Sequence, residues 1–162
     1  MANLPEPFLW REPQFSDLEA VAQLEALVFP DPWPQGLFAT EVGQPNRFQR
    51  VVLAPSGELA AYLFAAWQVD DLHILKVATH PQYQGRGLAT ALLQAALEEA
   101  ENKGGRSLTL EVRVSNRRAI ELYRRLGYLI AGRRTRYYQD GEDAYVMSRP
   151  ISRSLLDRFL FR

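Results

Sequence analysis

The chain contains no cysteine, and this absence excludes several kinds of chemistry. Disulfide bonds, thiolate metal sites and covalent acyl-cysteine intermediates all require that side chain. Histidine is scarce too: the chain has two, His73 and His80, and no carboxylate cluster at helical spacing accompanies them. We therefore expect no bound metal and interpret both histidines as structural.

An excess of charge of one sign is also missing. The chain carries 19 Lys and Arg residues and 19 Asp and Glu residues, which gives a formal net charge of zero. Without a net positive field, direct binding to nucleic acid or to an anionic membrane is not expected. No apolar run reaches the ~18 residues of a membrane span, and the N-terminal residues, with Pro5, Glu6 and Pro7, do not read as a signal peptide. The sequence therefore predicts a cytoplasmic protein.

The chain does have enough length and apolar content for one core. Its 162 residues, 47% of them hydrophobic, suit a single domain, and no internal repeat or low-complexity segment indicates a second one. We assign residues 1–151 to this domain and residues 152–162 to a C-terminal tail. The tail carries four apolar residues at helical spacing, Leu155, Leu156, Phe159 and Leu160.

Hydrophobic periodicity predicts a mixed α/β fold. Apolar runs and alternating patterns bounded by turn residues predict strands at residues 8–12, 48–54, 59–69, 72–79, 108–113, 128–131 and 144–148. Helices are predicted in four places: after a capping box of Ser16 and Glu19, near residues 38–42, from Gly87 to Gly104, and from Asn116 to Gly127. This order of elements allows helices to cover both faces of one central sheet.

One short turn is unusual in its chemistry. The residues Gln84-Gly85-Arg86-Gly87-Leu88-Ala89 follow an apolar run and lead directly into a helical pattern. The two glycines let backbone N–H groups converge on one point, and the N-terminus of the following helix adds partial positive charge. Arg86 supplies a full charge beside them. The turn therefore predicts a binding site for a phosphate-bearing ligand.

Two common nucleotide sites do not fit this turn. A dinucleotide-binding fingerprint would need a third glycine where Thr90 stands, and a strand ending directly at the turn, whereas residues 80–84 intervene. A nucleotide P-loop would need a Gly-Lys-Ser or Gly-Lys-Thr triplet, and the chain contains neither. The ligand is therefore expected to be of another kind.

The segment from Val77 to Gly127 resembles the acetyl-coenzyme A site of the GNAT superfamily of N-acetyltransferases. The superfamily signature, Gln or Arg, two residues, Gly, one residue, then Gly or Ala, is filled by Gln84, Gly87 and Ala89. Three further segments resemble the bacterial RimI type, which acetylates the N-terminal alanine of ribosomal small-subunit protein 18: Leu110 to Asn116, Ala119 to Tyr123, and Leu126 to Tyr128. The resemblance covers residues 8 to 151 of the chain.

This resemblance implies a fold, a co-substrate and an acceptor. The fold would be a central, mostly antiparallel twisted sheet with one splayed parallel strand pair. Acetyl-CoA would give its acetyl group directly to an amine without a metal, and the acceptor would be the N-terminus of a ribosomal or other protein. The residues implied in acetyl-CoA binding are Val77, Ala78, Thr79, Gln84, Gly85, Arg86, Gly87, Leu88, Ala89, Thr90 and Asn116, the last of which would also cap a helix.

Glu111 and Tyr123 are the candidate catalytic residues. Glu111 lies on the strand face opposite Leu110 and Val112, where a solvent-facing carboxylate is also common. Its match to the family's base position implies that it takes the proton from the amine. Tyr123 lies on the apolar stripe of its helix, as many core tyrosines do. Its match to the family's acid position implies that it protonates the departing thiolate.

Aromatic residues are the candidates for binding the acceptor peptide. Phe29, Trp33, Tyr137 and Tyr138 match elements that flank the peptide groove in the family, although such aromatics also serve as lids on a core. Three nearby acidic residues are candidate partners for a cationic N-terminus: Asp140, Glu142 and Asp143. Two other functions remain open, because the superfamily changes acceptors by altering loops. One is a small-amine or lysine acetyltransferase, and the other is a protein that binds acyl-CoA without turnover.

Overall fold

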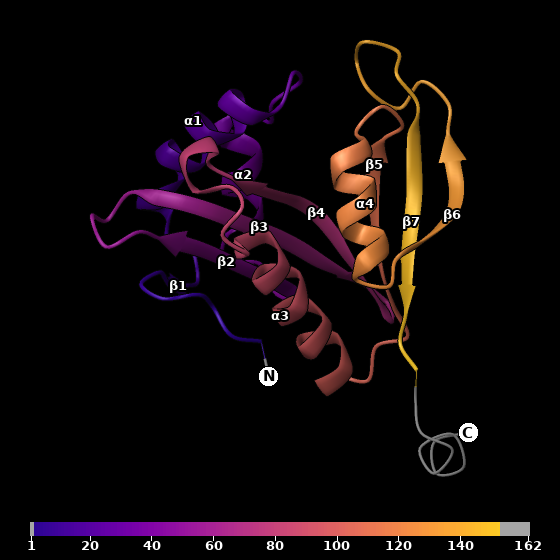
Figure 1. Cartoon of the computed structure of the whole chain (residues 1–162), viewed down its shortest axis with the longest axis horizontal. Helices are drawn as coiled ribbons and strands as arrows, with labels where there is room; N and C mark the ends of the chain where they lie inside the picture. Colours follow the sequence, from indigo (N-terminus) through magenta and orange to yellow (C-terminus); the bar gives the residue numbers. More distant parts are fainter. Residues whose placement is uncertain (1, 153–162) are drawn as a thin grey trace.

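The computed structural model describes residues 2–152, which form one seven-stranded sheet with helices packed against it (Figure 1). Along the sheet the strands follow the order β1-β2-β3-β4-β5-β7-β6. Neighbouring strands are antiparallel except for β4 and β5, which are parallel. The strand bounds are β1 Leu9–Arg11, β2 Arg47–Leu53, β3 Leu59–Gln68, β4 Asp71–Thr79, β5 Ser107–Arg113, β6 Leu129–Arg134 and β7 Ala144–Pro150. The predicted mixed α/β class is confirmed.

Helices cover both faces of the sheet. Their bounds are α1 Leu18–Val28, α2 Gln35–Glu41, α3 Leu88–Asn102 and α4 Arg117–Arg125. On one face, α1 and α2 bury an apolar cluster, called here the α1 cluster, that includes Leu18, Val21, Phe38, Tyr62 and Phe64. On the other face, α3 and α4 bury a larger α3 cluster that includes Leu63, Leu88, Leu92, Leu108 and Tyr123. β3 lies between the clusters and is buried on both sides, which explains its uninterrupted apolar sequence.

The parallel strand pair is short and opens along its length. β4 and β5 are in register only from Asp71 opposite Ser107 to His73 opposite Thr109. Farther along, β4 stays paired with β3 and β5 with β7, so the two strands diverge (Figure 1). A register shift between β3 and β4 leaves Leu75 without a register partner, as in a β-bulge that bends its strand. The predicted splayed pair is therefore present in the middle of the sheet.

The predictions for helix ends have different outcomes. Asn116 caps α4 as predicted, because its Oδ1 accepts a hydrogen bond from the Ala119 amide at 3.2 Å. Gly127 follows that helix with a φ of +92°, a left-handed conformation that glycine adopts without strain. The helix predicted near residues 38–42 begins earlier, at Gln35, because Pro34 occupies the N-cap position.

The prediction of a capping box formed by Ser16 and Glu19 is wrong. A single turn of 3-10 helix, Phe15–Asp17, precedes α1 and moves the start of the helical segment toward the N-terminus. Gln14 and Asp17 form the box instead, and the Gln14 amide donates to the Asp17 carboxylate at 2.7 Å. The box is displaced by two residues, because Gln14 takes the N-cap role predicted for Ser16 and Asp17 takes the N3 role predicted for Glu19.

Two further expectations concern the C-terminal tail and the absence of a membrane-spanning segment. The apolar stripe predicted in the C-terminal tail lies in residues 153–162, outside the described residues. Among the helices that the structure describes, none has the length and apolar character needed to cross a membrane.

Candidate active site

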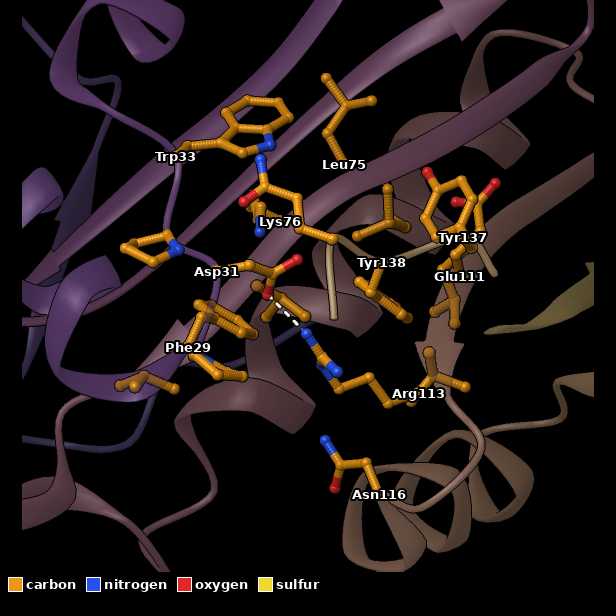
Figure 2. Close-up of a pocket in the computed structure, with 18 of the residues that line it drawn as sticks. Phe29, Asp31, Trp33, Leu75, Lys76, Glu111, Arg113, Asn116, Tyr137 and Tyr138 are labelled. Carbon is orange, nitrogen blue, oxygen red and sulfur yellow. Dashed lines mark hydrogen bonds and ion pairs between the residues drawn. The ribbon is translucent and has the colours of Figure 1, made fainter. Parts of the chain in front are cut away.

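A pocket of about 590 Å³ opens where β4 and β5 diverge (Figure 2). Its walls come from the loop after α1, from β4 and β5, from α4 and its N-cap residue, and from the loop between β6 and β7. The predicted site residues that line it are Phe29, Trp33, Val77, Glu111, Asn116, Tyr123, Tyr137 and Tyr138. The fold therefore brings both candidate catalytic residues and all four acceptor residues to one cavity.

Glu111 faces this pocket from β5, while its neighbours Leu110 and Val112 are buried in the core. Nε2 of His73 lies 2.6 Å from its Oε2, and Nε of Arg134 lies 3.4 Å from its Oε1. Burial by itself would raise the pKa of Glu111, but the hydrogen bonds and charges of His73 and Arg134 outweigh it and lower the pKa. The carboxylate is therefore ionised at neutral pH, although only 9% of the side chain is exposed.

His73, expected from the sequence to be structural, belongs to the site. It stands on β4 opposite Thr109, at the last register position before the strands diverge, and so reaches Glu111 on β5. Its Nδ1 lies 3.0 Å from Nε2 of Gln68. Because the Glu111 carboxylate can only accept, Nε2 carries a proton that faces it. His73 thus donates a hydrogen bond to the candidate base.

Tyr123 reaches the pocket from α4. Its ring packs in the α3 cluster, with its centroid 5.9 Å from that of Tyr128. Burial raises the pKa of Tyr123 to about 12, so the hydroxyl keeps its proton at neutral pH. Tyr123 is therefore both a core residue, through its ring, and a protonated phenol that borders the pocket, as a candidate acid would.

The predicted phosphate turn lies at the N-terminus of α3, beyond the lining of the pocket. Gly85 and Gly87 have φ angles of +79° and +81°, and both are exposed. These left-handed conformations favour glycine and bring the chain to the start of a helix, whose first amides have no partner within the helix. Arg118 of α4 donates from Nη1 to Oε1 of Gln84 at 3.4 Å. The turn is therefore a neighbour of the start of α4, where Asn116 borders the pocket.

Some of the predicted coenzyme residues offer only their backbones. The side chain of Ala78 is buried in the α1 cluster, and that of Leu88 is buried in the α3 cluster. The Thr79 carbonyl accepts a hydrogen bond from Nε2 of Gln84 at 3.5 Å, which joins the end of β4 to the turn. Ala89 and Thr90 are half-buried in the first turn of α3. Exposed side chains come from Gln84 and Arg86.

Aromatic side chains line the pocket on two sides. Phe29 and Trp33 come from the loop after α1, and Tyr137 and Tyr138 come from the loop between β6 and β7. Tyr137 lies beside Glu111 in Figure 2, and burial followed by the charge of that carboxylate raises the pKa of Tyr137. The predicted acceptor residues therefore face the candidate base from loops that are distant in sequence.

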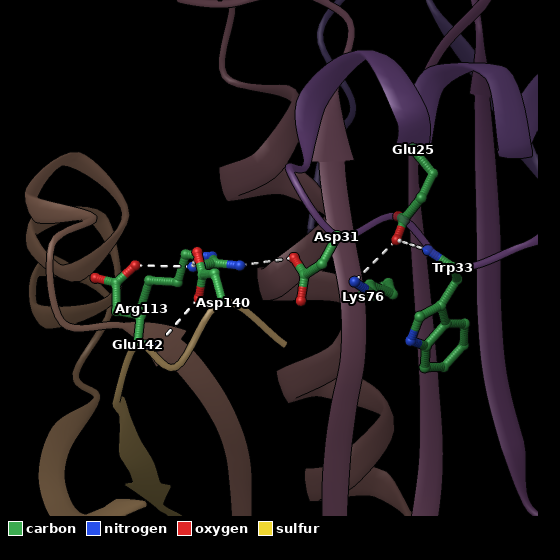
Figure 3. A network of polar contacts seen from close by, with 7 residues as sticks. All are labelled: Glu25, Asp31, Trp33, Lys76, Arg113, Asp140 and Glu142. Carbon is green, nitrogen blue, oxygen red and sulfur yellow. Dashed lines mark hydrogen bonds and ion pairs between the residues drawn. The ribbon is translucent and has the colours of Figure 1, made fainter. Parts of the chain in front are cut away.

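Arg113 joins these two loops across the pocket (Figure 3). Its guanidinium makes ion pairs of 2.8 Å with Asp31 on one side and with Asp140 and Glu142 on the other. Burial would lower the pKa of Arg113, but the hydrogen bonds with these carboxylates outweigh it and raise the pKa. Its Cζ also lies 4.1 Å from the ring centroid of Tyr138. One guanidinium among three carboxylates leaves this wall with a surplus of negative charge.

The acidic residues predicted as partners of a cationic N-terminus already have partners in the protein. Asp140 and Glu142 bind Arg113, and Asp143 binds Nε of Arg133 at 2.7 Å. These three carboxylates are therefore already paired with arginine side chains of the protein.

The pocket residues that were not predicted as members of the site include His73, Lys76 and Arg113. Each acts through a contact that connects distant parts of the chain, so no local motif identifies it. Within residues 2–152, no three His, Asp or Glu side chains are grouped as metal ligands would be.

The splayed strands, the glycine turn before α3 and the pocket between them define an acetyltransferase architecture. The profile of the Acetyltransferase (GNAT) family matches residues 18–128. The chain belongs to this family and is an acyltransferase.

Known proteins of similar sequence and structure agree with this assignment. The [ribosomal protein bS18]-alanine N-acetyltransferase of Escherichia coli (strain K12) is 38% identical over 140 residues, which span 85% of this chain and 93% of that protein. The crystal structure of the ribosomal-protein-S18-alanine N-acetyltransferase from Escherichia coli has a TM-score of 0.82 at 34% identity, covering 91% of this chain and 96% of that one. Arabidopsis thaliana NAA60 in complex with acetyl-CoA shares the fold, with a TM-score of 0.80 at 22% identity, over 89% of this chain and 98% of that one.

Proposed function

We propose that the protein is an N-terminal acetyltransferase that moves acetyl directly from acetyl-CoA to the N-terminal alanine of ribosomal protein bS18. One observation carries the proposal: Glu111 and Tyr123 border the same pocket at the diverging strands, together with the aromatic acceptor residues. The name of the Escherichia coli relative, 38% identical over most of this chain, supports the acceptor.

The residues around the pocket fit acetyl-CoA, which supplies a thioester-activated acetyl group when bound. The exposed backbone at Gly85 and Gly87, the N-terminus of α3 and the charge of Arg86 suit its pyrophosphate. β4 is in register with β5 only as far as His73, so the edge of β4 that faces β5 leaves backbone groups from Val77 onward for the amides of the pantetheine arm. In this proposal, the thioester of bound acetyl-CoA lies near the pocket.

Glu111 acts in this proposal as the base that removes the proton from the acceptor amine. An α-amino group has a reference pKa of about 7.7–8.0, so part of it is neutral at physiological pH and a weak base suffices. A lysine amine, at about 10.4, would require a stronger base. The lowered pKa of Glu111 therefore favours an N-terminal acceptor, and the hydrogen bond from His73 orients its carboxylate.

Tyr123 acts as the acid that gives a proton to the departing thiolate. Its raised pKa, about 12, keeps the phenol protonated across the range in which the amine becomes neutral. Asn116 lies at the start of the same helix and borders the same pocket. The two residues therefore belong to the coenzyme side, opposite the aromatic walls.

The acceptor end would enter between the aromatic loops. Phe29, Trp33, Tyr137 and Tyr138 offer apolar surface for an alanine methyl and the following side chains. The surplus negative charge around Arg113 attracts a cationic peptide end. Ribosomal proteins are made in the cytoplasm, and we place the enzyme there for that reason.

Transfer to three acceptors tests the proposal. The purified protein and acetyl-CoA are incubated with a peptide beginning Ala-Arg-Tyr with a free amine, with an N-terminally blocked peptide that contains a lysine, and with a small polyamine. We expect turnover of the free peptide alone. Turnover of the blocked peptide or of the polyamine would contradict the proposed acceptor, and binding of acetyl-CoA without any turnover would contradict catalysis.

A further inference from the structure

Glu25 is a fully buried carboxylate outside the proposed chemistry. It lies on the inward stripe of α1 with Leu18, Val21 and Leu24, and its side chain has 0% exposure. Apolar residues of the α1 cluster surround this stripe. A buried charge is costly to desolvate and is often replaceable by an apolar residue without loss of stability. Its position therefore calls for a role other than packing.

The contacts of Glu25 converge on the acceptor loop (Figure 3). Its Oε2 accepts a hydrogen bond from the Trp33 backbone amide at 2.9 Å and pairs with Nζ of Lys76 at 2.8 Å. Its Oε1 accepts a hydrogen bond from the Tyr62 hydroxyl. One carboxylate thus connects α1, β3, β4 and the loop that carries Trp33.

The sequence of this loop explains why such an anchor is needed. Pro30, Pro32 and Pro34 alternate through it, and proline has no amide donor. From residue 30 to residue 34, Asp31 and Trp33 are therefore the backbone donors that remain. The Trp33 amide donates to Glu25. The segment does not form a ladder of backbone hydrogen bonds, and a side chain from α1 holds it.

Lys76 extends this anchor to the walls of the pocket. Its ammonium lies 4.3 Å from the ring centroid of Phe29 and 5.4 Å from that of Trp33. All three residues line the pocket. Because the ammonium is also paired with Glu25, the two rings are held by a cation that is itself fixed in place.

We propose that Glu25 is a positioning residue that sets the affinity for the acceptor peptide by clamping the Trp33 backbone and, through Lys76, the rings of Phe29 and Trp33. This inference rests on the proposed function, since it assigns those rings to the acceptor. Glu25 touches neither the coenzyme turn nor Glu111 through the contacts described. These contacts of Glu25 with Trp33 and Lys76, called here the clamp, therefore change the affinity for the acceptor peptide and leave the affinity for acetyl-CoA unchanged.

The test removes both charges together, so that neither is stranded in the core. In the paired variant Glu25→Leu with Lys76→Met, we expect KM for the Ala-Arg-Tyr peptide to rise about tenfold, with kcat and KM for acetyl-CoA nearly unchanged. Tyr62→Phe is the matched control, because it removes a bond to the same carboxylate without touching the loop. We expect that variant to keep the peptide KM of the unmodified protein.

A second comparison shows whether Glu25 acts through Trp33. In a Trp33→Ala background, the paired substitution should raise the peptide KM by a smaller factor than it does in the unmodified protein, because only its effect through Phe29 remains. Hydrogen exchange of the Trp33 amide supplies a readout independent of turnover. We expect exchange at this amide to quicken at least roughly tenfold in the paired variant, while amides of α3 exchange at their original rates.

The outcomes separate this inference from the proposed function. A folded paired variant with an unchanged peptide KM and an unchanged Trp33 exchange rate overturns the clamp and leaves the acetyltransferase intact. Absence of transfer to the peptide by the unmodified protein overturns the proposed acceptor. In that case the exchange rate of the Trp33 amide still decides whether Glu25 anchors the loop.

Discussion

At the scale of single residues, the two proposed catalytic side chains are held in opposite protonation states. His73 and Arg134 lower the pKa of Glu111 against the effect of burial, and burial raises that of Tyr123 to about 12. At neutral pH the base is therefore ionised and the acid is protonated. A rise in rate with pH then reports loss of a proton from the acceptor amine, and a fall is expected only as pH approaches the pKa of Tyr123.

Glu111→Gln tests the base. We expect kcat/KM for the Ala-Arg-Tyr peptide to fall about 100-fold near neutral pH, and by less at high pH, where the amine has already lost its proton. Initial rates measured between about pH 6 and 10 show this convergence. Glu121→Gln, on the exposed face of α4, is the control and should leave the profile unchanged. An unchanged rate at neutral pH in the Glu111 variant would remove Glu111 from the mechanism.

Tyr123→Phe tests the acid. We expect kcat to fall while KM for acetyl-CoA stays nearly constant, because the hydroxyl is needed mainly as the thiolate departs. Tyr128→Phe is the matched control, since its ring lies 5.9 Å away in the same core and does not line the pocket. Steady-state kinetics with both substrates varied separate the two parameters. Weakened acetyl-CoA binding with normal kcat would identify Tyr123 as a scaffold residue.

Some features of these residues could be predicted from the sequence and others could not. Alternation along β5 placed Glu111 on the face opposite Leu110, and that geometry is local. The contact of His73 with Glu111 joins residues 38 positions apart and depends on the register of the parallel strands, which no local pattern specifies. The lowered pKa of Glu111 could not be predicted for the same reason.

At the scale of elements, the glycine turn before α3 is the feature that we propose to bind the pyrophosphate of the coenzyme. Its conformation is local, because two glycines with φ angles of +79° and +81° precede a helix start, so the sequence alone predicted it. The start of α1 illustrates the opposite case. Gln14 and Asp17 have the same spacing as Ser16 and Glu19, and which pair forms the capping box depends on the turn of 3-10 helix before α1.

Gly87→Ala tests the turn. A left-handed backbone costs a residue with a Cβ about 1–2 kcal/mol, and the added Cβ would meet Pro5 only at 3.8 Å, an ordinary contact. We expect KM for acetyl-CoA to rise roughly tenfold with the peptide KM unchanged, because the strained turn no longer aligns its amides. Gly57→Ala is the control, since it has a φ of +88° in the β2–β3 turn and open space around it. An equal effect of both variants on acetyl-CoA would contradict a coenzyme role for the turn.

At the scale of the whole molecule, the divergence of β4 from β5 creates the site. The sequence predicted the strands and the helices on both faces. The length of the parallel register between β4 and β5 depends instead on how β4 pairs with β3 and how β5 pairs with β7. The Arg113 and Glu25 contacts then tie loops from different parts of the chain to this frame. These links depend on tertiary packing, which explains why residue patterns did not reveal them.

Acetyl-CoA should stabilise the whole fold if it binds at this opening. At a concentration about 100-fold above its Kd, a ligand that binds only the folded state raises the free energy of unfolding by about 2.7 kcal/mol. We expect a corresponding rise in Tm in thermal unfolding, and a smaller rise for Gly87→Ala at the same concentration. Equal rises in the two proteins would place the coenzyme elsewhere.

The most direct measurement of the central claim identifies which nitrogen receives the acetyl group in a peptide that offers both. A peptide beginning Ala-Arg-Tyr with a free amine and an internal lysine is incubated with the protein and acetyl-CoA at neutral pH, and fragment mass spectrometry locates the product. The account predicts acetylation of the N-terminal alanine, because the lowered pKa of Glu111 suits the less basic α-amine. Acetylation of the lysine with a free N-terminus would contradict it.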